Sequence, residues 1–147
     1  MIANPLLKKL RLPAGGRAAF INDPSGYVDA LGLPAGVVVS ETVDERCDFA
    51  QIFVRDSGEL AAIIDGVLAR ARPDCVLWFC YPKLSSGVAS DLTRDEGWAA
   101  LTAAGWRGIA SVAIDAVWSG VRFRPGSIDG GVAGIDAQYA GGKAALR

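Results

Sequence analysis

The sequence predicts a three-layer α/β protein, with a Rossmann-like, mostly parallel sheet, helices on both faces and a C-terminal antiparallel hairpin. Three observations predict this fold. Short apolar segments bounded by turn residues alternate with amphipathic segments, which is typical of strands joined by helical crossovers. The segments 47–54 and 75–80 are apolar on both faces, as buried parallel strands are. The last apolar segments, 109–114 and 117–124, are too close together for a helical crossover and therefore predict a hairpin.

Length and composition indicate one globular domain. The chain has 147 residues, of which 51% are hydrophobic and 21% charged, so it can bury a sizeable core. We assign residues 1–125 to a single α/β domain. Residues 126–147 are rich in Gly and Ala and have no apolar period, so we expect a flexible tail.

Charge and missing residue types exclude several functions. Fifteen basic and 16 acidic residues give a net charge of -1, so we expect neither a nucleic acid nor a membrane as partner. No signal peptide and no run of roughly 18–20 apolar residues is present, so we expect a cytoplasmic protein. The absence of histidine excludes Ser-His-Asp and Cys-His nucleophile systems, and no metal site is expected. The three cysteines form no CxxC pair and are expected to be reduced.

The N-terminal third begins with two predicted helices on either side of a strand. Asn4 and Pro5 are typical of the N-cap and first residue of a helix, and 17–21 is a short apolar strand. Asp23 and Pro24 repeat the cap pattern and predict a second helix at that point. A strand, a polar turn and a helix also begin nucleotide-binding folds, but this turn has a single glycine, so we favour a plain capping turn.

The middle of the chain carries the clearest helix signal. Segments 37–40 and 47–54 are predicted strands. Asp56 and Glu59 have the spacing of a capping box, and apolar residues recur at helical spacing after them, which predicts a helix over 57–71.

The central strand at 75–80 leads into a polar loop that contains Lys83. Thr93 and Glu96 have the spacing of a second capping box, which predicts a helix beginning there, before the hairpin. Cys80 ends the apolar run, and without a histidine we expect a buried, inert thiol.

The segment ARPDCVLWFCYPK at 71–83 and the closing hairpin resemble parts of class I S-adenosylmethionine-dependent methyltransferases. The segment matches their central fifth strand, and the hairpin matches their inserted antiparallel strand. The resemblance implies a shortened, methyltransferase-like fold. Where those enzymes have a glycine-rich cofactor loop, this chain has NDPSGY at 22–27, and Pro24 removes an amide donor. Glu41, after the second strand, matches the carboxylate that would bind the ribose.

The chain is also similar to a bacterial domain family of unknown function. Members have a strand ending in WPK or YPK, then SG, then Thr-Arg-Asp, and a late ID-x-x-WS-G/A-x-[RK]F. The similarity covers about residues 7 to 124 and implies no activity. The matching residues are Tyr81, Pro82, Lys83, Ser86, Gly87, Thr93, Arg94, Asp95, Ile114, Asp115, Trp118, Ser119, Gly120, Arg122 and Phe123.

A candidate site follows from the predicted topology. Ligands of open parallel sheets bind beyond the carboxyl ends of the strands, where the strand order reverses. We expect a small anionic ligand or a protein partner there, and we assign no catalytic residue. In the alternative interpretation, Lys83 pairs with Asp91 or Asp95 and only ties down its loop. The candidate ligand-binding residues are Asn22, Asp23, Arg55, Tyr81, Lys83, Ser85 and Ser86.

Two functions of different class are compatible with these residues. We favour a non-catalytic small-ligand or protein-binding module on a degenerate methyltransferase-like scaffold, which needs no cofactor. The alternative is an S-adenosylmethionine-dependent transferase with an atypical cofactor loop.

Overall fold

The computed structural model describes residues 4–126. The predicted tail at 126–147 therefore lies outside the described residues, apart from Gly126. No helix in the described part of the chain is both long and apolar enough to cross a membrane. In chain order the elements are α1 (Pro5–Lys9), β1 (Arg17–Ile21), α2 (Tyr27–Leu31), β2 (Val38–Ser40), β3 (Phe49–Phe53), α3 (Ser57–Arg70), β4 (Val76–Pro82), the 3₁₀ turn η1 (Leu84–Ser86), α4 (Ala99–Ala103), β5 (Trp106–Ala113) and β6 (Trp118–Pro125).

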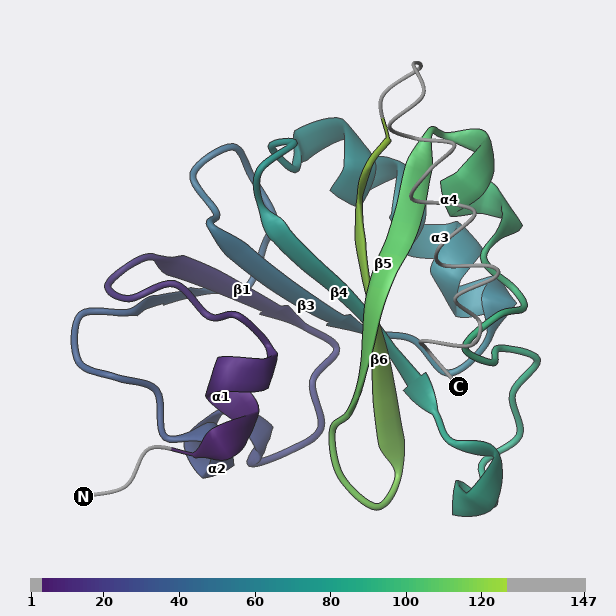
Figure 1. Cartoon of the computed structure of the whole chain (residues 1–147), viewed down its shortest axis with the longest axis horizontal. Coiled ribbons are helices and arrows are strands. Elements are labelled where there is room, and N and C mark those ends of the chain that lie inside the picture. Colours follow the sequence, from purple (N-terminus) through teal and green to yellow (C-terminus); the bar gives the residue numbers. More distant parts are fainter. Residues whose placement is uncertain (1–3, 127–147) are drawn as a thin grey trace.

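The strands form one six-stranded sheet in the order β2-β1-β3-β4-β6-β5 (Figure 1). The first four strands pair in parallel. β6 lies between β4 and β5 and is antiparallel to both, so β5 runs in the same direction as β4. The mostly parallel Rossmann-like sheet with a C-terminal antiparallel hairpin, predicted from the sequence, is confirmed.

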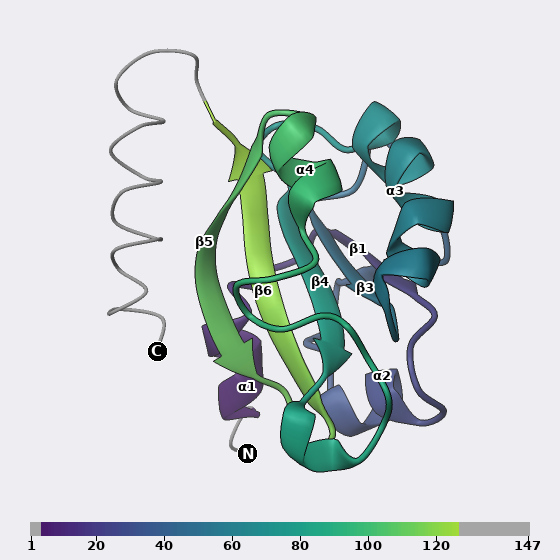
Figure 2. The same cartoon turned by 90° about the vertical axis from the view of Figure 1, so that its right-hand side faces the viewer.

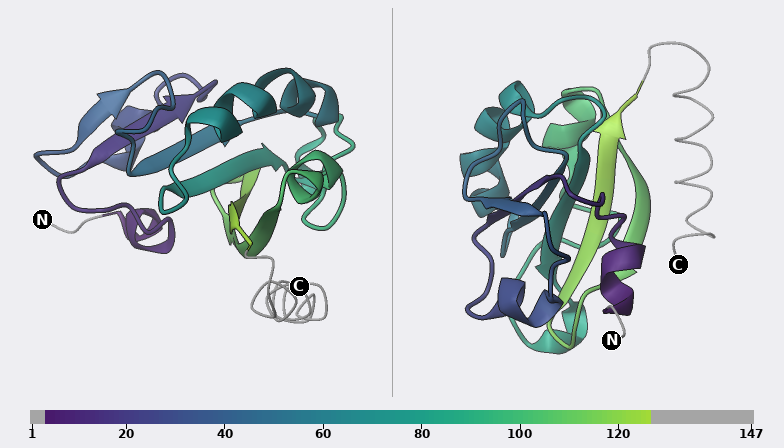
Figure 3. Two further views of the ribbon diagram at one scale, coloured as in Figure 1. Left: turned by 90° about the horizontal axis from the view of Figure 1, so that it is seen from above. Right: turned by 90° about the vertical axis from the view of Figure 1, so that its left-hand side faces the viewer.

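Helices cover both faces of the sheet, which gives the predicted three layers. Leu7 and Leu10 of the α1 region pack with Leu31 of α2 against one face. Leu60 of α3 and Leu101 of α4 pack against the other. Figure 2 shows α3 and α4 on the side of the sheet opposite α1, and Figure 3 shows the same separation from above.

The predicted burial of the central strands is confirmed. Every residue of β3 is buried, and six of the seven residues of β4 are buried. Trp78 in β4 is 1% exposed, and its indole Nε1 donates to the carbonyl of Leu10 at 2.8 Å. This bond holds the end of α1 against the sheet.

Local sequence signals explain where α1 and α3 begin. The side chain of Asn4 accepts a hydrogen bond from the amide of Leu6 at 2.9 Å, as predicted for an N-cap. Asp56 accepts from the amide of Glu59 at 2.9 Å in the same way, and α3 ends at Arg70. The predicted helix over 57–71 is therefore confirmed.

Two predicted helix starts were wrong. The second helix begins at Tyr27, three residues after Pro24, because Gly26 has φ +79° and interrupts the helical backbone. The fourth helix begins at Ala99 rather than near Thr93. The Thr93 hydroxyl accepts from the amides of Asp95 and Glu96, but Gly97 at φ +95° ends that turn before a helix can form.

The amino ends of the strands are closed by hydrogen bonds around Asp48. Its carboxylate accepts from the amide of Arg17 at 3.0 Å and from the guanidinium of Arg72 at 2.7 Å. These bonds lower the pKa of the Asp48 carboxyl below its usual value. These contacts tie the start of β1 and the loop after α3 to the start of β3.

Candidate functional site

Two of the cavities that the described residues form lie at the carboxyl edge of the sheet. The strand order reverses between β1 and β3, because β2 lies on one side of β1 and β3 lies on the other. In open α/β sheets this reversal opens a crevice beyond the strand ends. One cavity lies at that reversal, and the other lies beyond the ends of β4 and β5.

The first cavity, here called the edge cleft, has a volume of about 560 Å³. This volume is within the range of about 300–1,000 Å³ that is typical of small-molecule sites. Residues from β3, α3, β6 and the loops that follow β1 and β3 form its walls. They are Asn22, Asp23, Pro24, Phe53, Arg55, Glu59, Ala62, Ile63 and Trp118.

The uncompensated charge of the edge cleft is negative. The guanidinium of Arg55 donates to Glu59, with Nη2 at 2.7 Å and Nε at 2.8 Å from Oε2, and the backbone amide of Arg55 donates to Oε1 at 2.7 Å. These bonds lower the pKa of the Glu59 carboxyl, which keeps it ionised. Asp23 forms no ion pair with any residue in 4–126. The cleft therefore suits a cationic group better than an anionic one.

Aromatic rings form part of the cleft wall. Trp118 meets Phe53 in a T-shaped contact with ring centroids 5.1 Å apart and planes at 88°. Trp118 is partly exposed, so part of its indole is open to a ligand. The face of an indole attracts a cation through its quadrupole, which adds to the attraction of the Asp23 carboxylate.

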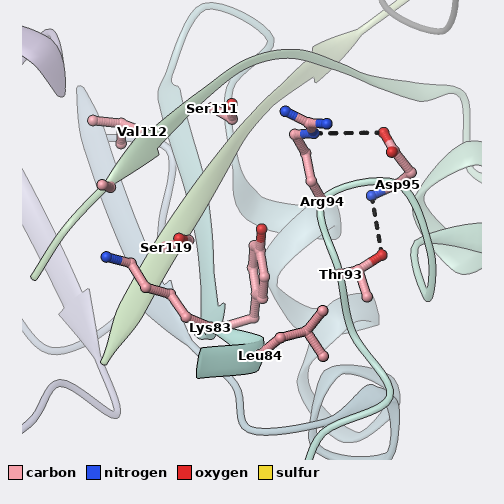
Figure 4. A pocket seen from close by; sticks show the side chains of 10 residues that line it. Lys83, Leu84, Thr93, Arg94, Asp95, Ser111, Val112 and Ser119 are labelled. Atoms are coloured by element: carbon pink, nitrogen blue, oxygen red, sulfur yellow. Dashed lines mark hydrogen bonds and ion pairs between the residues drawn. The ribbon is translucent and has the colours of Figure 1, made fainter. Parts of the chain in front are cut away.

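The second cavity, here called the Lys83 cavity, has a volume of about 430 Å³ (Figure 4). Lys83, Val112 and Ser119 lie on one side of it, and Thr93, Arg94 and Asp95 lie on the other. Hydroxyl groups are common in its wall. The lining residues are Tyr81, Lys83, Leu84, Thr93, Arg94, Asp95, Ser111, Val112, Ala113 and Ser119.

Lys83 provides an uncompensated positive charge in this second cavity. It forms no ion pair within the part of the chain that the structure describes, whereas Arg94 pairs with Asp95 at 3.8 Å. Asp91, one of the two partners considered for Lys83, instead accepts from the amide of Ser57 at 2.8 Å and from its hydroxyl. The loop is therefore tied to the start of α3 by Asp91 and not by Lys83.

Tyr81 lies beside Lys83 with most of its ring buried. Burial raises the pKa of the Tyr81 phenol, and a hydrogen bond with Ser119 opposes that shift. The phenol is therefore neutral at neutral pH and available as a hydrogen-bonding group.

The structure places five of the seven predicted site residues in the two cavities. Three of them, Asn22, Asp23 and Arg55, share the edge cleft, while Tyr81 and Lys83 share the other cavity. Ser85 and Ser86 line neither. Ser85 is exposed, and the Ser86 hydroxyl donates to the carbonyl of Lys83 at 2.7 Å within the turn η1.

Sequence reasoning missed Trp118 and Glu59 in the edge cleft, and Thr93 and Arg94 in the Lys83 cavity. A signal for Trp118 was present. Because β6 is antiparallel, its first residue lies at the edge where the parallel strands end, and Trp118 is that residue. A signal for Glu59 was its position four residues after Arg55, where a helical ion pair forms.

Neither cavity is lined by a cysteine among the described residues. The Cys80 thiol is fully buried, and burial raises its pKa to about 12, which makes it inert as predicted. Within residues 4–126, no group of three or more acidic or thiol side chains could hold a metal ion.

Comparisons with known proteins show that the fold is similar to that of several methyltransferases. No protein-family model and no curated protein matches the chain. Among solved structures, the B. subtilis M1A22 tRNA methyltransferase TrmK has a TM-score of 0.56 at 12% identity, over 96% of this chain and 70% of that one. The complex of DhpI with SAH has a TM-score of 0.53 at 17% identity, over 82% of both chains. A SAM-dependent methyltransferase from Aquifex aeolicus has 0.50 at 14% identity, over 80% of this chain and 86% of that one. At these identities the similarity establishes the fold alone.

Proposed function

We propose that this protein binds S-adenosylmethionine in the edge cleft and transfers its methyl group to an acceptor. One observation carries the proposal. At the strand-order reversal of a methyltransferase-like sheet, the chain forms a cleft with a net negative charge and an indole in its wall. S-adenosylmethionine carries a positively charged sulfur and an ammonium group, and both suit such a cleft. The solved structures similar to this chain include a tRNA methyltransferase and a SAM-dependent methyltransferase, which supports the same function.

The residues of the cleft fit this cofactor. Asp23 would bind the ammonium or the ribose hydroxyls, and Trp118 would face the sulfonium. When bound, S-adenosylmethionine supplies an electrophilic methyl group. Pro24 lacks an amide donor, but Gly26 leaves open space around its Cα, since no atom lies within 4 Å of the position of a Cβ. Glu41, exposed just after β2, is a second carboxylate that could bind the ribose.

Asp23→Asn is expected to weaken S-adenosylmethionine binding about tenfold, because it removes the uncompensated charge of the cleft and keeps the side-chain size. The measurement is isothermal titration calorimetry with S-adenosylmethionine and with S-adenosylhomocysteine, whose sulfur is neutral. We expect the sulfonium form to bind more tightly to the wild type. The matched control is Asp29→Asn, which removes an exposed carboxylate from α2 outside the cleft and should leave both affinities unchanged.

Three results would contradict the proposal. They are no binding of either compound at millimolar concentration, equal affinity for both, or equal loss in the Asp23 and Asp29 variants. A fourth result would contradict only the proposed catalysis. If the protein binds S-adenosylmethionine but transfers its methyl group to no acceptor in a cell extract, cofactor binding stands and methyl transfer is rejected.

A second candidate function is a non-catalytic module that binds a small anionic ligand, and the Lys83 cavity favours it. Lys83→Gln is expected to weaken binding of phenyl phosphate at least fivefold, since it removes the uncompensated charge in that cavity. NMR titration of the whole chain measures the affinity. Arg70→Gln, on the exposed end of α3, is the control for loss of one positive charge. If phenyl phosphate and neutral benzyl alcohol bind alike, the cavity is not an anion site.

A further inference from the structure

A group of basic side chains lies on the face of the sheet that α1 covers. Lys8 and Lys9 are in the last turn of α1, and Arg11 follows the helix. Arg122 and Arg124 lie two residues apart in β6, so their side chains share a face. The pairing register of β6 shows on which face of the sheet Arg122 and Arg124 lie. Arg122 pairs with Trp78, whose ring packs with Leu7 and Leu10 of the α1 region.

Three of these side chains, Lys8, Lys9 and Arg11, line a third cavity, here called the basic groove, of about 560 Å³. Arg122 lies beside the groove on the same face of the sheet, because its cross-strand partners Trp78 and Ala110 both line the groove, and directly paired residues share a face. The lining residues are Lys8, Lys9, Arg11, Trp78, Ala110, Ser111 and Val112.

No carboxylate of the described residues neutralises this group. None of the five basic side chains forms an ion pair within residues 4–126. The Nε of Arg122 is buried and has no hydrogen-bond partner there. Burial lowers the pKa of Arg122, and the charges of Arg11 and Arg124 lower it further. A partly buried cation beside two like charges is costly, and an anion bound next to it would lower that cost.

We propose that the basic groove binds the phosphate backbone of a nucleic acid. The positive charges come from two separate segments, residues 8–11 and 122–124, which the register of β6 and the packing of α1 bring to one face of the sheet. Four of the five side chains are exposed, which suits a chain of phosphates passing along the surface. Arg122 and Arg124 lie about 6.6 Å apart along the strand, which lets them contact successive charged groups.

The chemistry of the groove indicates contact with phosphates and not with bases. Trp78 is 1% exposed and its indole N–H already donates to Leu10, so it offers no stacking surface. Binding is therefore expected to be independent of sequence and strongly dependent on salt. The net charge of -1, which led us to expect no nucleic acid, averages this local group with acidic residues elsewhere. The inference does not depend on methyl transfer, since the groove and the edge cleft share no residue.

The test is fluorescence anisotropy with the full chain and a labelled 20-nucleotide RNA of mixed sequence, with a DNA of the same sequence as the second arm. For a single strand, log K falls with log salt by about 0.7 for each phosphate contact. Five contacts predict a slope of about -3.5. Lys9→Gln and Arg124→Gln should each bring it to about -2.8, and the double variant to about -2.1. Arg70→Gln, which removes a charge far from the groove, should leave the slope unchanged.

These measurements, together with competition by lipid vesicles and by inorganic pyrophosphate, can overturn the proposal. Absence of binding to RNA and DNA at 50 mM salt would do so, as would equal slopes for Lys9→Gln and Arg70→Gln. Preference for phosphatidylserine vesicles over both nucleic acids would reassign the groove to a membrane. Tighter binding of inorganic pyrophosphate than of RNA would reassign it to a small ligand. Circular dichroism of each variant checks the fold, and both substituted residues are exposed.

Discussion

Replacing Trp78 with alanine is expected to lower the free energy of unfolding by about 3–5 kcal/mol. The side chain is 1% exposed and is among the largest that the structure buries completely. The substitution removes the ring from the centre of the sheet and leaves a cavity. It also removes the bond to the Leu10 carbonyl, which joins two residues 68 positions apart in sequence. Urea unfolding followed by far-UV circular dichroism measures the change.

Trp78→Phe separates the two causes, because it keeps an aromatic ring but removes the indole N–H. We expect a loss of about 1–3 kcal/mol, since the Leu10 carbonyl would remain buried without its donor. Val38→Ala is the control, because Val38 is 50% exposed on the edge strand β2 and its loss should change stability by less than about 0.5 kcal/mol. If Trp78→Phe unfolds like the wild type, the bond to Leu10 contributes nothing to the attachment of α1.

The sequence predicted the sheet well because each strand carries its own signal. The segments around β3 and β4 are apolar on both faces, and only the middle of a parallel sheet satisfies that pattern. The link between β5 and β6 is too short for a helical crossover, so it also predicts a hairpin from local sequence alone. The starts of α2 and α4 were missed because Gly26 and Gly97 adopt positive φ, and the capping residues before them suggested helices.

The site was harder to predict than the fold, because it depends on which side chains meet across the sheet. Asn22, Asp23 and Arg55 were correctly placed at the carboxyl edge, where strand order reverses. The net charge of this group was not predicted correctly, because Glu59 neutralises Arg55 and leaves Asp23 uncompensated. The group of basic side chains joins residues 8–11 to residues 122–124, and no local window of the sequence contains both.

The three cavities differ in charge, and this difference separates the proposed ligands. The edge cleft is acidic and suits a cationic cofactor. The Lys83 cavity carries one uncompensated cation, and the basic groove carries several. Such a division would let a cationic cofactor and a polyanionic substrate bind one small domain without competing for the same surface.

A hydrogen-bonded group in the core links α2 to the centre of the sheet. Gln51 in β3 is the buried polar side chain of the described core, with no exposed surface. The phenol of Tyr27 donates to its Oε1 at 2.9 Å, and its Nε2 donates to the Cys80 sulfur at 3.4 Å. Burial raises the pKa of the Tyr27 phenol well above its usual value, so the phenol stays protonated and can donate. The bond holds α2, and with it the loop at 22–26, against β3.

Gln51→Leu is expected to destabilise the protein by about 1–3 kcal/mol, because the Tyr27 phenol is left buried without an acceptor. Tyr27→Phe leaves the Gln51 Oε1 without its donor, but it should cost less, since the Gln51 Nε2 keeps its contact with Cys80. The double variant removes both polar groups, so its loss should be at least about 1 kcal/mol smaller than the sum of the single losses. Urea unfolding of the four proteins measures this coupling. Strictly additive losses would mean that the two side chains do not depend on each other, and α2 would then be held by its apolar contacts alone.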